Sequence, residues 1–321
     1  MGFLSDIPGI KVGNVRDERI LTGCTVILTG KEGAVTGVDV RGGSPGSREN
    51  MLLAPEKQVD RVHAILLSGG SAFGLEAAGG VMNYLKEKNS GYPTGIKPVP
   101  IVPASVIFDL GLGEPDFPTA EMGYAACEEA GTKNSHSSSG NVGAGYGATI
   151  GKIRGRDYAM KGGLSEAFLQ LETGVNMGVL VVVNCFGEII SRNGEILAGP
   201  YDREQEQFIS TVNTMEKLDA DRNAAGPGEN TTLAVIAVDA GLNKAKARKL
   251  AEMGQNGIAR AIRPAHSMFD GDTVYALSTG NKKADLSLLG SRAADLVAAA
   301  IRSAIQEAEM LAGIPARKDI I

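Results

Sequence analysis

The stretch Glu229 to Ala240 reads E-N-T-T-L-A-V-I-A-V-D-A and joins a pair of threonines to a long apolar run. The run Leu233 to Val238 has the length of a strand and no polar alternation, which predicts a strand covered on both faces. A polar loop broken by Gly and Pro, Ala220 to Glu229, leads directly into it. A flexible loop joined to a rigid strand is a place where a strained peptide bond can sit, and Asn230–Thr231 lies at that junction.

A threonine at such a junction can serve as a nucleophile. Its hydroxyl can attack the carbonyl carbon of the preceding residue, and water then opens the resulting ester. Cleavage at Asn230–Thr231 would leave Thr231 with a free α-amino group, whose unperturbed pKa of about 7.7–8.0 makes it a base beside its own hydroxyl. Because threonine is common at strand starts, this pattern alone favours an ordinary strand residue.

Further apolar and periodic segments on both sides of this strand indicate the fold class. Apolar runs of strand length lie at Cys24–Leu28, Ala64–Leu67, Ile101–Val102, Val179–Val183 and Val274–Leu277. Helical spacing fits Gly74–Lys88, Pro118–Ala130, Arg203–Leu218, Lys244–Ile262 and Asp285–Leu311. The regular βαβ rhythm of about 30 residues is not kept, which favours sheets sandwiched by helices. No repeat or shift in composition marks a boundary, so we expect residues 1–321 to form a single domain.

Composition and charge narrow the class of protein. The net charge is -5, Lys and Arg are scattered and Trp is absent, so nucleic acid is not an expected partner. The longest apolar runs are far below the roughly 18 residues of a membrane-spanning helix. Three separated cysteines, Cys24, Cys127 and Cys185, predict neither a disulfide framework nor a zinc site. With no secretion signal recognised in residues 1–10, we expect a cytoplasmic protein without metal or cofactor.

Two segments place polar side chains beside apolar runs. In H-S-M-F-D-G-D-T, His266 to Thr273, Asp270 and Asp272 flank a glycine and can converge on one point. In V-V-V-N-C-F-G, Val181 to Gly187, Asn184 ends a strand, where a side-chain amide can stabilise an oxyanion. Both patterns also fit ordinary turns. We interpret Cys185, next to Asn184, as a small buried residue rather than a nucleophile.

Two glycine-rich segments remain. G-N-V-G-A-G-Y-G-A-T-I-G-K, Gly140 to Lys152, is not a P-loop, because Ile153 stands where Ser or Thr is required. Its glycines allow close packing or leave room for a substrate beside Tyr146, and Lys152 is either a catalytic cation or a surface residue. S-G-G-S-A-F-G, Ser68 to Gly74, lacks the G-x-S-x-G pattern of a nucleophile elbow. We interpret it as a turn at a helix start that offers Ser71 and Phe73 as candidates for the substrate pocket.

Together these segments resemble the DmpA or P1 family of self-processing aminopeptidases, which includes β-peptidyl aminopeptidases and nylon-oligomer hydrolases. The matching stretches are D-V-R-G-G (39–43), L-L-S-G-G-S-A-F-G-L-E-A-A-G-G-V (66–81), V-P-I-V-P-A-S-V-I-F-D-L (99–110), G-A-G-Y-G-A-T-I-G-K (143–152), V-V-N-C-F-G (182–187), E-N-T-T (229–232) and F-D-G-D-T-V-Y-A-L-S-T (269–279). Their order and spacing match over nearly the whole chain. The Asn-Thr and D-G-D elements are most similar to the branch of 6-aminohexanoate-oligomer endo-hydrolases.

The resemblance implies a four-layer α-β-β-α sandwich of the N-terminal-nucleophile type. It further implies self-cleavage into fragments 1–230 and 231–321, a homo-tetramer, no cofactor, and hydrolysis of short peptides or linear ω-amino-acid oligomers. The roles implied for single residues are Thr231 as nucleophile, Asp270 and Asp272 as its orienting carboxylates, Asn184 as oxyanion contact and Lys152 within the site.

One segment departs from the family pattern, and two other functions are alternatives. The segment Lys161 to Leu171 differs after Leu164 from the small-residue stretch of the family, which concerns substrate preference. An acyltransferase of the ornithine-acetyltransferase type would keep the threonine but pass the acyl group to an amine. A non-catalytic protein would use the glycine-rich loops to bind a nucleotide.

Overall fold

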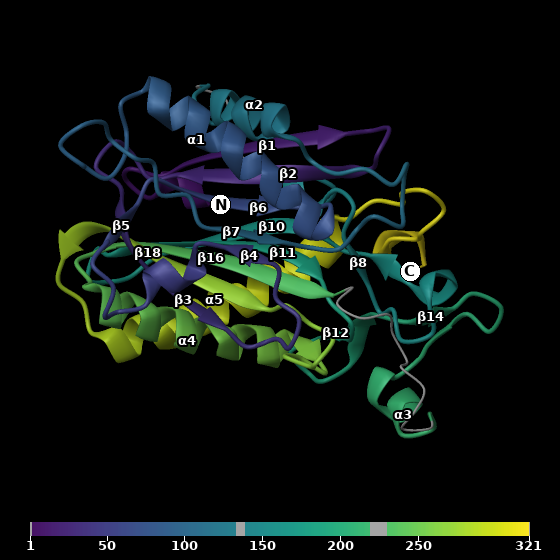
Figure 1. Cartoon of the computed structure of the whole chain (residues 1–321). Helices are drawn as coiled ribbons and strands as arrows, with labels where there is room; N and C mark the ends of the chain where they lie inside the picture. The colour runs from purple at the N-terminus through teal and green to yellow at the C-terminus, as the bar shows by residue number, and fades with distance from the viewer. Residues whose placement is uncertain (1, 133–138, 219–229, 321) are drawn as a thin grey trace.

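The computed structural model describes residues 2–132, 139–218 and 230–320, and their elements stack in four layers (Figure 1). Two sheets face each other in the centre. Helices α1 and α2 cover the outer face of one sheet, and α4 and α5 cover the outer face of the other. This arrangement confirms the expected α-β-β-α sandwich, in which each sheet buries one face against its helices and the other against the second sheet.

The first sheet has the strand order β1-β2-β6-β7-β4. Its elements are β1 (Lys11–Asp17), β2 (Thr22–Leu28), β4 (Ser47–Arg48), β6 (Ala64–Ser68) and β7 (Ala104–Val106), with α1 (Ala77–Glu87) and α2 (Ala120–Ala130) as its helices. All seven residues of β2 are buried, as expected for a strand without alternation.

The second sheet has the order β10-β11-β16-β18-β3-β5 and carries the segment on which the sequence analysis opened. Its elements are β3 (Ala34–Val40), β5 (Arg61–Val62), β10 (Gly163–Gln170), β11 (Asn176–Asn184), β16 (Thr231–Ala240) and β18 (Thr273–Lys282), with α4 (Lys244–Ala261) and α5 (Leu286–Glu307) as its helices. Strand β16 is buried at all ten positions. It runs antiparallel to β11 and parallel to β18. Asn243 caps α4 by accepting a hydrogen bond from the Lys246 N–H at 2.9 Å.

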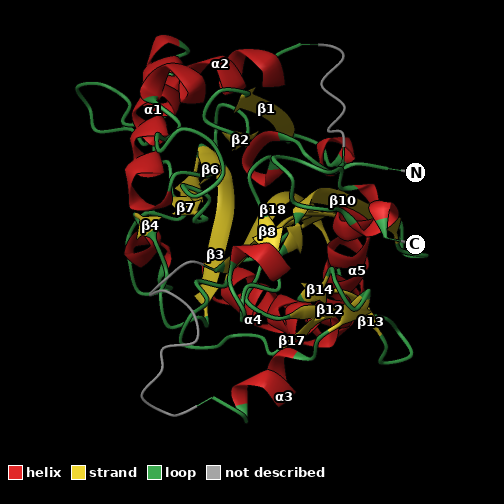
Figure 2. Ribbon diagram, turned by 90° about the vertical axis from the view of Figure 1, so that its right-hand side faces the viewer, coloured by secondary structure: helices red, strands yellow, loops and turns green. Residues whose placement is uncertain are grey.

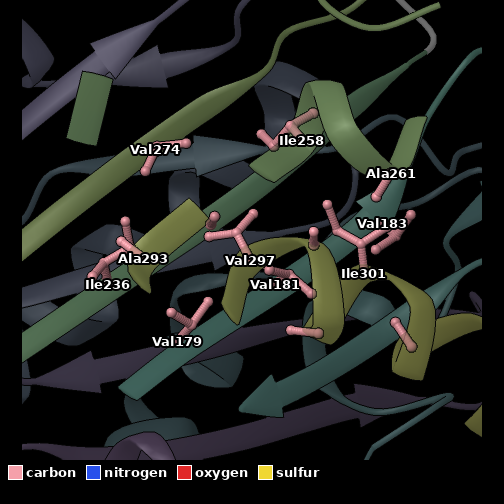
Figure 3. Packing of buried hydrophobic residues seen from close by; sticks show 14 of the residues in the cluster. Val179, Val181, Val183, Ile236, Ile258, Ala261, Val274, Ala293, Val297 and Ile301 are labelled. Atoms are coloured by element: carbon pink, nitrogen blue, oxygen red, sulfur yellow. The ribbon is translucent and has the colours of Figure 1, made fainter. Parts of the chain in front are cut away.

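Apolar cores fill the three spaces between the layers. Figure 3 shows the core beneath the second sheet, where Val181 of β11 and Ile236 of β16 meet Val297 and Ile301 of α5. Alternate residues of the same strands, such as Leu180 and Leu233, face the other sheet. Because both faces of β16 are buried, its end is held in a fixed position, which matters for the residues placed there.

Two predicted elements were wrong. Ile101–Val102 is extended but forms no strand, since Pro100 and Pro103 have no N–H to donate, and the strand begins only after them. Most of Arg203–Leu218 is not helical: the Asp202 carboxylate accepts hydrogen bonds from the N–H groups of Glu204 and Gln205 and forms a turn. A one-turn helix follows there, α3 (Thr211–Met215).

Short strands complete the described part of the chain. They are β8 (Thr149–Ile150), β9 (Met160–Lys161), β12 (Glu188–Ile190), β13 (Ile196–Ala198), β14 (Tyr201–Asp202), β15 (Gln207–Phe208) and β17 (Ile262–Arg263). None of the helices within the described residues has the length and apolar character needed to cross a bilayer. The predicted loop Ala220–Glu229 lies outside the described residues.

Candidate active site

Thr231 and Asn184 lie opposite each other at one end of the second sheet. Thr231 is the first residue of β16, Asn184 is the last residue of β11, and the antiparallel register pairs them directly. Both are buried, Thr231 with only 3% of its surface exposed. Directly opposed residues have Cβ atoms about 4.5–5.5 Å apart, so the two side chains are neighbours.

The parallel neighbour of β16 brings the two aspartates to the same end. Strand β18 starts at Thr273, directly after the D-G-D segment, and Asn230 forms an isolated bridge with Asp270. The Thr232 N–H donates to Oδ1 of Asp272 at 2.7 Å. The two carboxylates therefore flank the strand end that carries Thr231.

The carbonyl of Asn230 has two close contacts. The hydroxyl of Thr231 lies 2.5 Å from this carbonyl oxygen, and the Gly271 N–H donates to it at 2.8 Å. A donor on a carbonyl oxygen polarises the bond and stabilises the negative charge that develops when a nucleophile adds to the carbon. The carbonyl oxygen of the peptide bond before Thr231 thus accepts from both a hydroxyl and an N–H group.

Each aspartate is held by residues that sequence reasoning did not single out. Oδ2 of Asp272 accepts from the His266 N–H at 3.0 Å and lies 2.9 Å from His266 Nδ1. Oδ2 of Asp270 accepts from the hydroxyl of Ser267 at 2.5 Å and from its N–H at 3.0 Å. His266 has a positive φ of 57°, which is uncommon for a residue other than glycine and directs its main chain toward Asp272.

Burial and the neighbouring charge of Asp272 raise the pKa of Asp270 to about 6. The hydrogen bonds from Ser267 and from the Phe186 N–H act in the opposite direction, because they stabilise the ionised form. Asp270 is thus ionised above about pH 6 and protonated below it.

Lys152 joins this group through Asn184. Its Nζ donates to Oδ1 of Asn184 at 2.9 Å, and the Thr149 N–H donates to the same oxygen at 3.0 Å. With both donors on Oδ1, the amide presents Nδ2 as its donor, and this nitrogen reaches Phe108 O at 3.3 Å. The structure therefore brings together Thr231, Asn184, Lys152, Asp270 and Asp272.

Two buried ionisable residues near the glycine-rich segment, Lys161 and Asp109, were missed from the sequence. Lys161 is fully buried, and its Nζ donates to the carbonyls of Tyr146 and Ala148 at 2.9 and 2.6 Å. Burial lowers the pKa of Lys161 to about 7, although the nearby Asp109 acts against this shift. Burial also raises the pKa of Asp109 to about 6. Lysine is so rarely buried that the sequence favours a surface position for it.

The three predicted pocket residues have their described contacts outside the central group. Tyr146 is buried, with the Arg16 guanidinium 4.9 Å from its ring centre. Ser71 follows Gly70, whose N–H donates to Asp109 at 2.7 Å. Phe73 is 64% exposed and stacks on Phe117 with ring centres 5.2 Å apart. Among the described residues, none of the contacts of these three side chains reaches Thr231.

Other predictions have simpler outcomes. Cys185 is buried, and burial raises its pKa well above the ordinary value, as for a small core residue. The segment after Gly140 continues into the short strand β8 rather than into a helix, so the phosphate-binding arrangement of a dinucleotide fold does not form. Within the described ranges, no three His, Cys, Asp or Glu side chains gather closely enough to hold a metal ion.

Comparison with known proteins shows the family of the chain. A family model described as peptidase family S58 matches residues 3–318. The chain belongs to this family, and its class is that of enzymes that hydrolyse amide bonds.

Relatives cover most of the chain. An uncharacterised aminopeptidase of Mycobacterium leprae is 39% identical, over 98% of this chain and 93% of that protein. A 6-aminohexanoate-oligomer endohydrolase of a Kocuria species is 33% identical, over 85% of this chain and 74% of that protein.

Solved structures share the fold. A β-aminopeptidase of a Burkholderia species is similar with a TM-score of 0.70 and 19% identity, over 98% of this chain and 91% of that one. The L-aminopeptidase D-Ala-esterase/amidase of Ochrobactrum anthropi, described as a variant of the Ntn hydrolase fold, gives a TM-score of 0.68 with 16% identity, over 95% and 86%.

Proposed function

We propose that this chain cleaves its own Asn230–Thr231 bond and then uses Thr231 as an N-terminal nucleophile. Its substrates would be short peptides or linear ω-amino-acid oligomers. The observation that carries the proposal is the pair of contacts on the Asn230 carbonyl, with the Thr231 hydroxyl at 2.5 Å and the Gly271 N–H at 2.8 Å.

Self-cleavage proceeds in two steps. Oγ1 of Thr231 adds to the carbonyl carbon of Asn230 while the Gly271 N–H stabilises the oxyanion, and the C–N bond then breaks as the hydroxyl proton passes to the leaving nitrogen. This leaves an ester on Oγ1 and an amine at Thr231. Water hydrolyses the ester, so fragment 1–230 ends in a carboxylate and fragment 231–321 begins with a free Thr231.

The side chain of Asn230 gives a reason for cleavage to be favourable. It is fully buried, and neither of its polar atoms has a hydrogen-bond partner among the described residues. A buried unsatisfied polar group costs about 1–3 kcal/mol. Cleavage makes Asn230 a chain end that can move to water, which removes this cost.

The processed site supplies each group that amide hydrolysis needs. The α-amine of Thr231 takes the proton from Oγ1 as this oxygen attacks the substrate carbonyl, and returns it to the leaving amine. The amide of Asn184, held by Lys152 and Thr149, supports the oxyanion. Asp270 and Asp272 hold the α-ammonium when it forms. Water then releases the acyl group from Thr231 as an acid.

The substrate class rests on the relatives. One is named as an endohydrolase of 6-aminohexanoate oligomers and another as an aminopeptidase, and both names describe hydrolysis of an amide bond. The expected homo-tetramer belongs to the same proposal, and the native mass of the purified protein checks it.

Hydrolysis by three purified proteins tests the proposal. The native chain should hydrolyse an aminoacyl p-nitroanilide or a 6-aminohexanoate oligomer, Thr231→Ala should be inactive, and Thr231→Ser should keep part of the activity because it keeps a hydroxyl. With ornithine added, the product should remain the free acid rather than an acylated amine. Thr231→Ala protein that hydrolyses these amides at the native rate would contradict the proposal.

A further inference from the structure

An arginine-lined pocket lies apart from the residues that surround Thr231. It has a volume of about 640 Å³ and forms where the last turn of α4, one side of α5 and the turn after β12 come together. Figure 2 shows β12, α4 and α5 next to one another in the lower part of the molecule. Its walls carry four arginines, Arg192, Arg260, Arg292 and Arg302, with Asp295 as the one carboxylate among the lining residues.

The charge of this pocket differs from that of the whole chain. Four guanidinium groups face one carboxylate, whereas the protein as a whole has a net charge of -5. Asp295 is shared, since Arg260 lies 2.8 Å from one of its oxygens and Arg292 lies 3.7 Å from the other. One carboxylate cannot neutralise four cations, so the pocket keeps a positive potential.

Arg302 is held in place without being neutralised. Its Nε donates to the carbonyl of Ile190 and one terminal nitrogen donates to the carbonyl of Arg260, each at 2.8 Å. These partners are main-chain groups, so they orient the guanidinium but carry no full negative charge. Partial burial lowers the pKa of Arg302, and the nearby charge of Arg192 acts in the same direction because the two cations repel each other. A bound anion would relieve this repulsion.

The spacing of the arginines and the residues that line the pocket indicate the kind of ligand. Arg292 and Arg302 lie ten residues apart on α5, which is about 15 Å along a helix axis. A ligand with more than one anionic group can therefore contact several arginines. Ala298 is the only apolar residue among the described residues of the lining, so these walls offer little to a ligand with a large apolar body.

We propose that this pocket binds a small polyvalent oxyanion, such as a di- or triphosphate or a tricarboxylate. Guanidinium groups bind phosphate and carboxylate oxygens through paired N–H donors, and such bonds are among the strongest polar contacts in proteins. The volume is within the range of about 300–1,000 Å³ of small-molecule sites. The binding does not depend on cleavage at Thr231.

Calorimetric titration of the purified full chain tests this proposal. Tripolyphosphate and citrate are titrated separately at matched ionic strength, because diffuse surface attraction is screened by salt. We expect saturable binding of one or both, and the tighter of the two identifies the phosphate or the carboxylate source. The double variant Arg192→Gln/Arg292→Gln should bind at least about tenfold more weakly.

Two further variants make the result decisive. Arg248→Gln removes an exposed arginine of α4 that pairs with Glu252, and it should bind as the native chain does. Arg302→Lys keeps the charge but loses the paired donors, and should also weaken binding. Absence of saturable binding up to about 5 mM, a Kd that corresponds to only about 3 kcal/mol, would overturn the proposal. Equal weakening in Arg248→Gln would do the same, because it would show attraction to net charge alone.

Discussion

At the scale of single residues, the ionisation of Asp270 makes the activity of the site depend on pH. Its pKa of about 6 is the result of burial and Asp272, which raise it, and of the hydrogen bonds from Ser267 and Phe186, which lower it. Only the ionised form attracts the ammonium group of a processed Thr231. Activity should therefore fall as the pH drops through the pKa of Asp270.

Ser267→Ala should shift that fall to higher pH. The variant removes the 2.5 Å hydrogen bond to the ionised carboxylate, which raises the pKa of Asp270 by about one to two units, since a hydrogen bond to a charged group contributes about 1.5–3 kcal/mol. The measurement is kcat/KM between pH 4.5 and 8.5. Ser90→Ala, which removes the buried hydroxyl bond to the Lys31 carbonyl, should leave the profile unchanged. An unshifted profile in Ser267→Ala would refute this role of Asp270.

The buried Lys161 makes the stability of the chain depend on pH. Its pKa is about 7 in the folded chain, against an ordinary value of 10.5. Between these values the unfolded chain binds more protons than the folded chain, so the free energy of unfolding rises with pH there.

Lys161→Met should lose this dependence. Between pH 7 and pH 9, the free energy of unfolding of the native chain should rise by about 2 kcal/mol more than that of the variant. Urea unfolding at the two pH values measures the difference. The same pH dependence in both proteins would show that Lys161 stays charged when folded.

The sequence identified the central group but not the residues that hold it. Thr231, Asn184, Asp270 and Asp272 each stand at an end of an apolar run, and strand ends that meet at one sheet edge bring such residues together. His266 and Ser267 were within the quoted segment, and the signal was their position four and three residues before Asp270. Lys161 had no comparable signal, because its partners are carbonyls that only the folded chain brings near.

At the scale of elements, β16 and the D-G-D segment approach so closely that only glycine fits between them. A Cβ at Gly271 would lie 2.7 Å from Oγ1 of Thr231, and a Cβ at Gly42 would lie 2.1 Å from the carbonyl oxygen of Asp270. Contacts this short do not occur for real Cβ atoms, so the hydroxyl would have to move.

Gly271→Ala should therefore stop self-cleavage and activity while the chain still folds. Gly79→Ala in α1 is the matched control, since a Cβ there meets nothing within 4 Å. It should process normally and gain about 0.5–1 kcal/mol, because alanine favours a helix over glycine. Normal processing of Gly271→Ala would mean that the position of the Thr231 hydroxyl is not critical.

Strands were predicted correctly where burial on both faces requires a continuous apolar run in the sequence, as in β2, β11, β16 and β18. It failed where a local polar contact decided the structure, as at Asp202, whose carboxylate forms a turn in place of the predicted helix. It also missed β1 and β3, because glycines and partly exposed residues interrupt their pattern.

At the scale of the whole molecule, cleavage before Thr231 would not separate the two fragments. The smaller fragment contributes β16, β18, α4 and α5, while β11 and β3 belong to the larger one. Strand β16 pairs with β11 and β18 pairs with β3, so both strands of the smaller fragment lie between strands of the larger fragment. The fragments should elute together in gel filtration and separate only in denaturant.

The most direct test of the central claim is the intact mass of the purified chain in denaturing conditions. We predict two species, residues 1–230 and residues 231–321 with threonine at its N-terminus, and a single full-length species for Thr231→Ala. A native protein that stays one full-length chain and still hydrolyses amides would contradict the account.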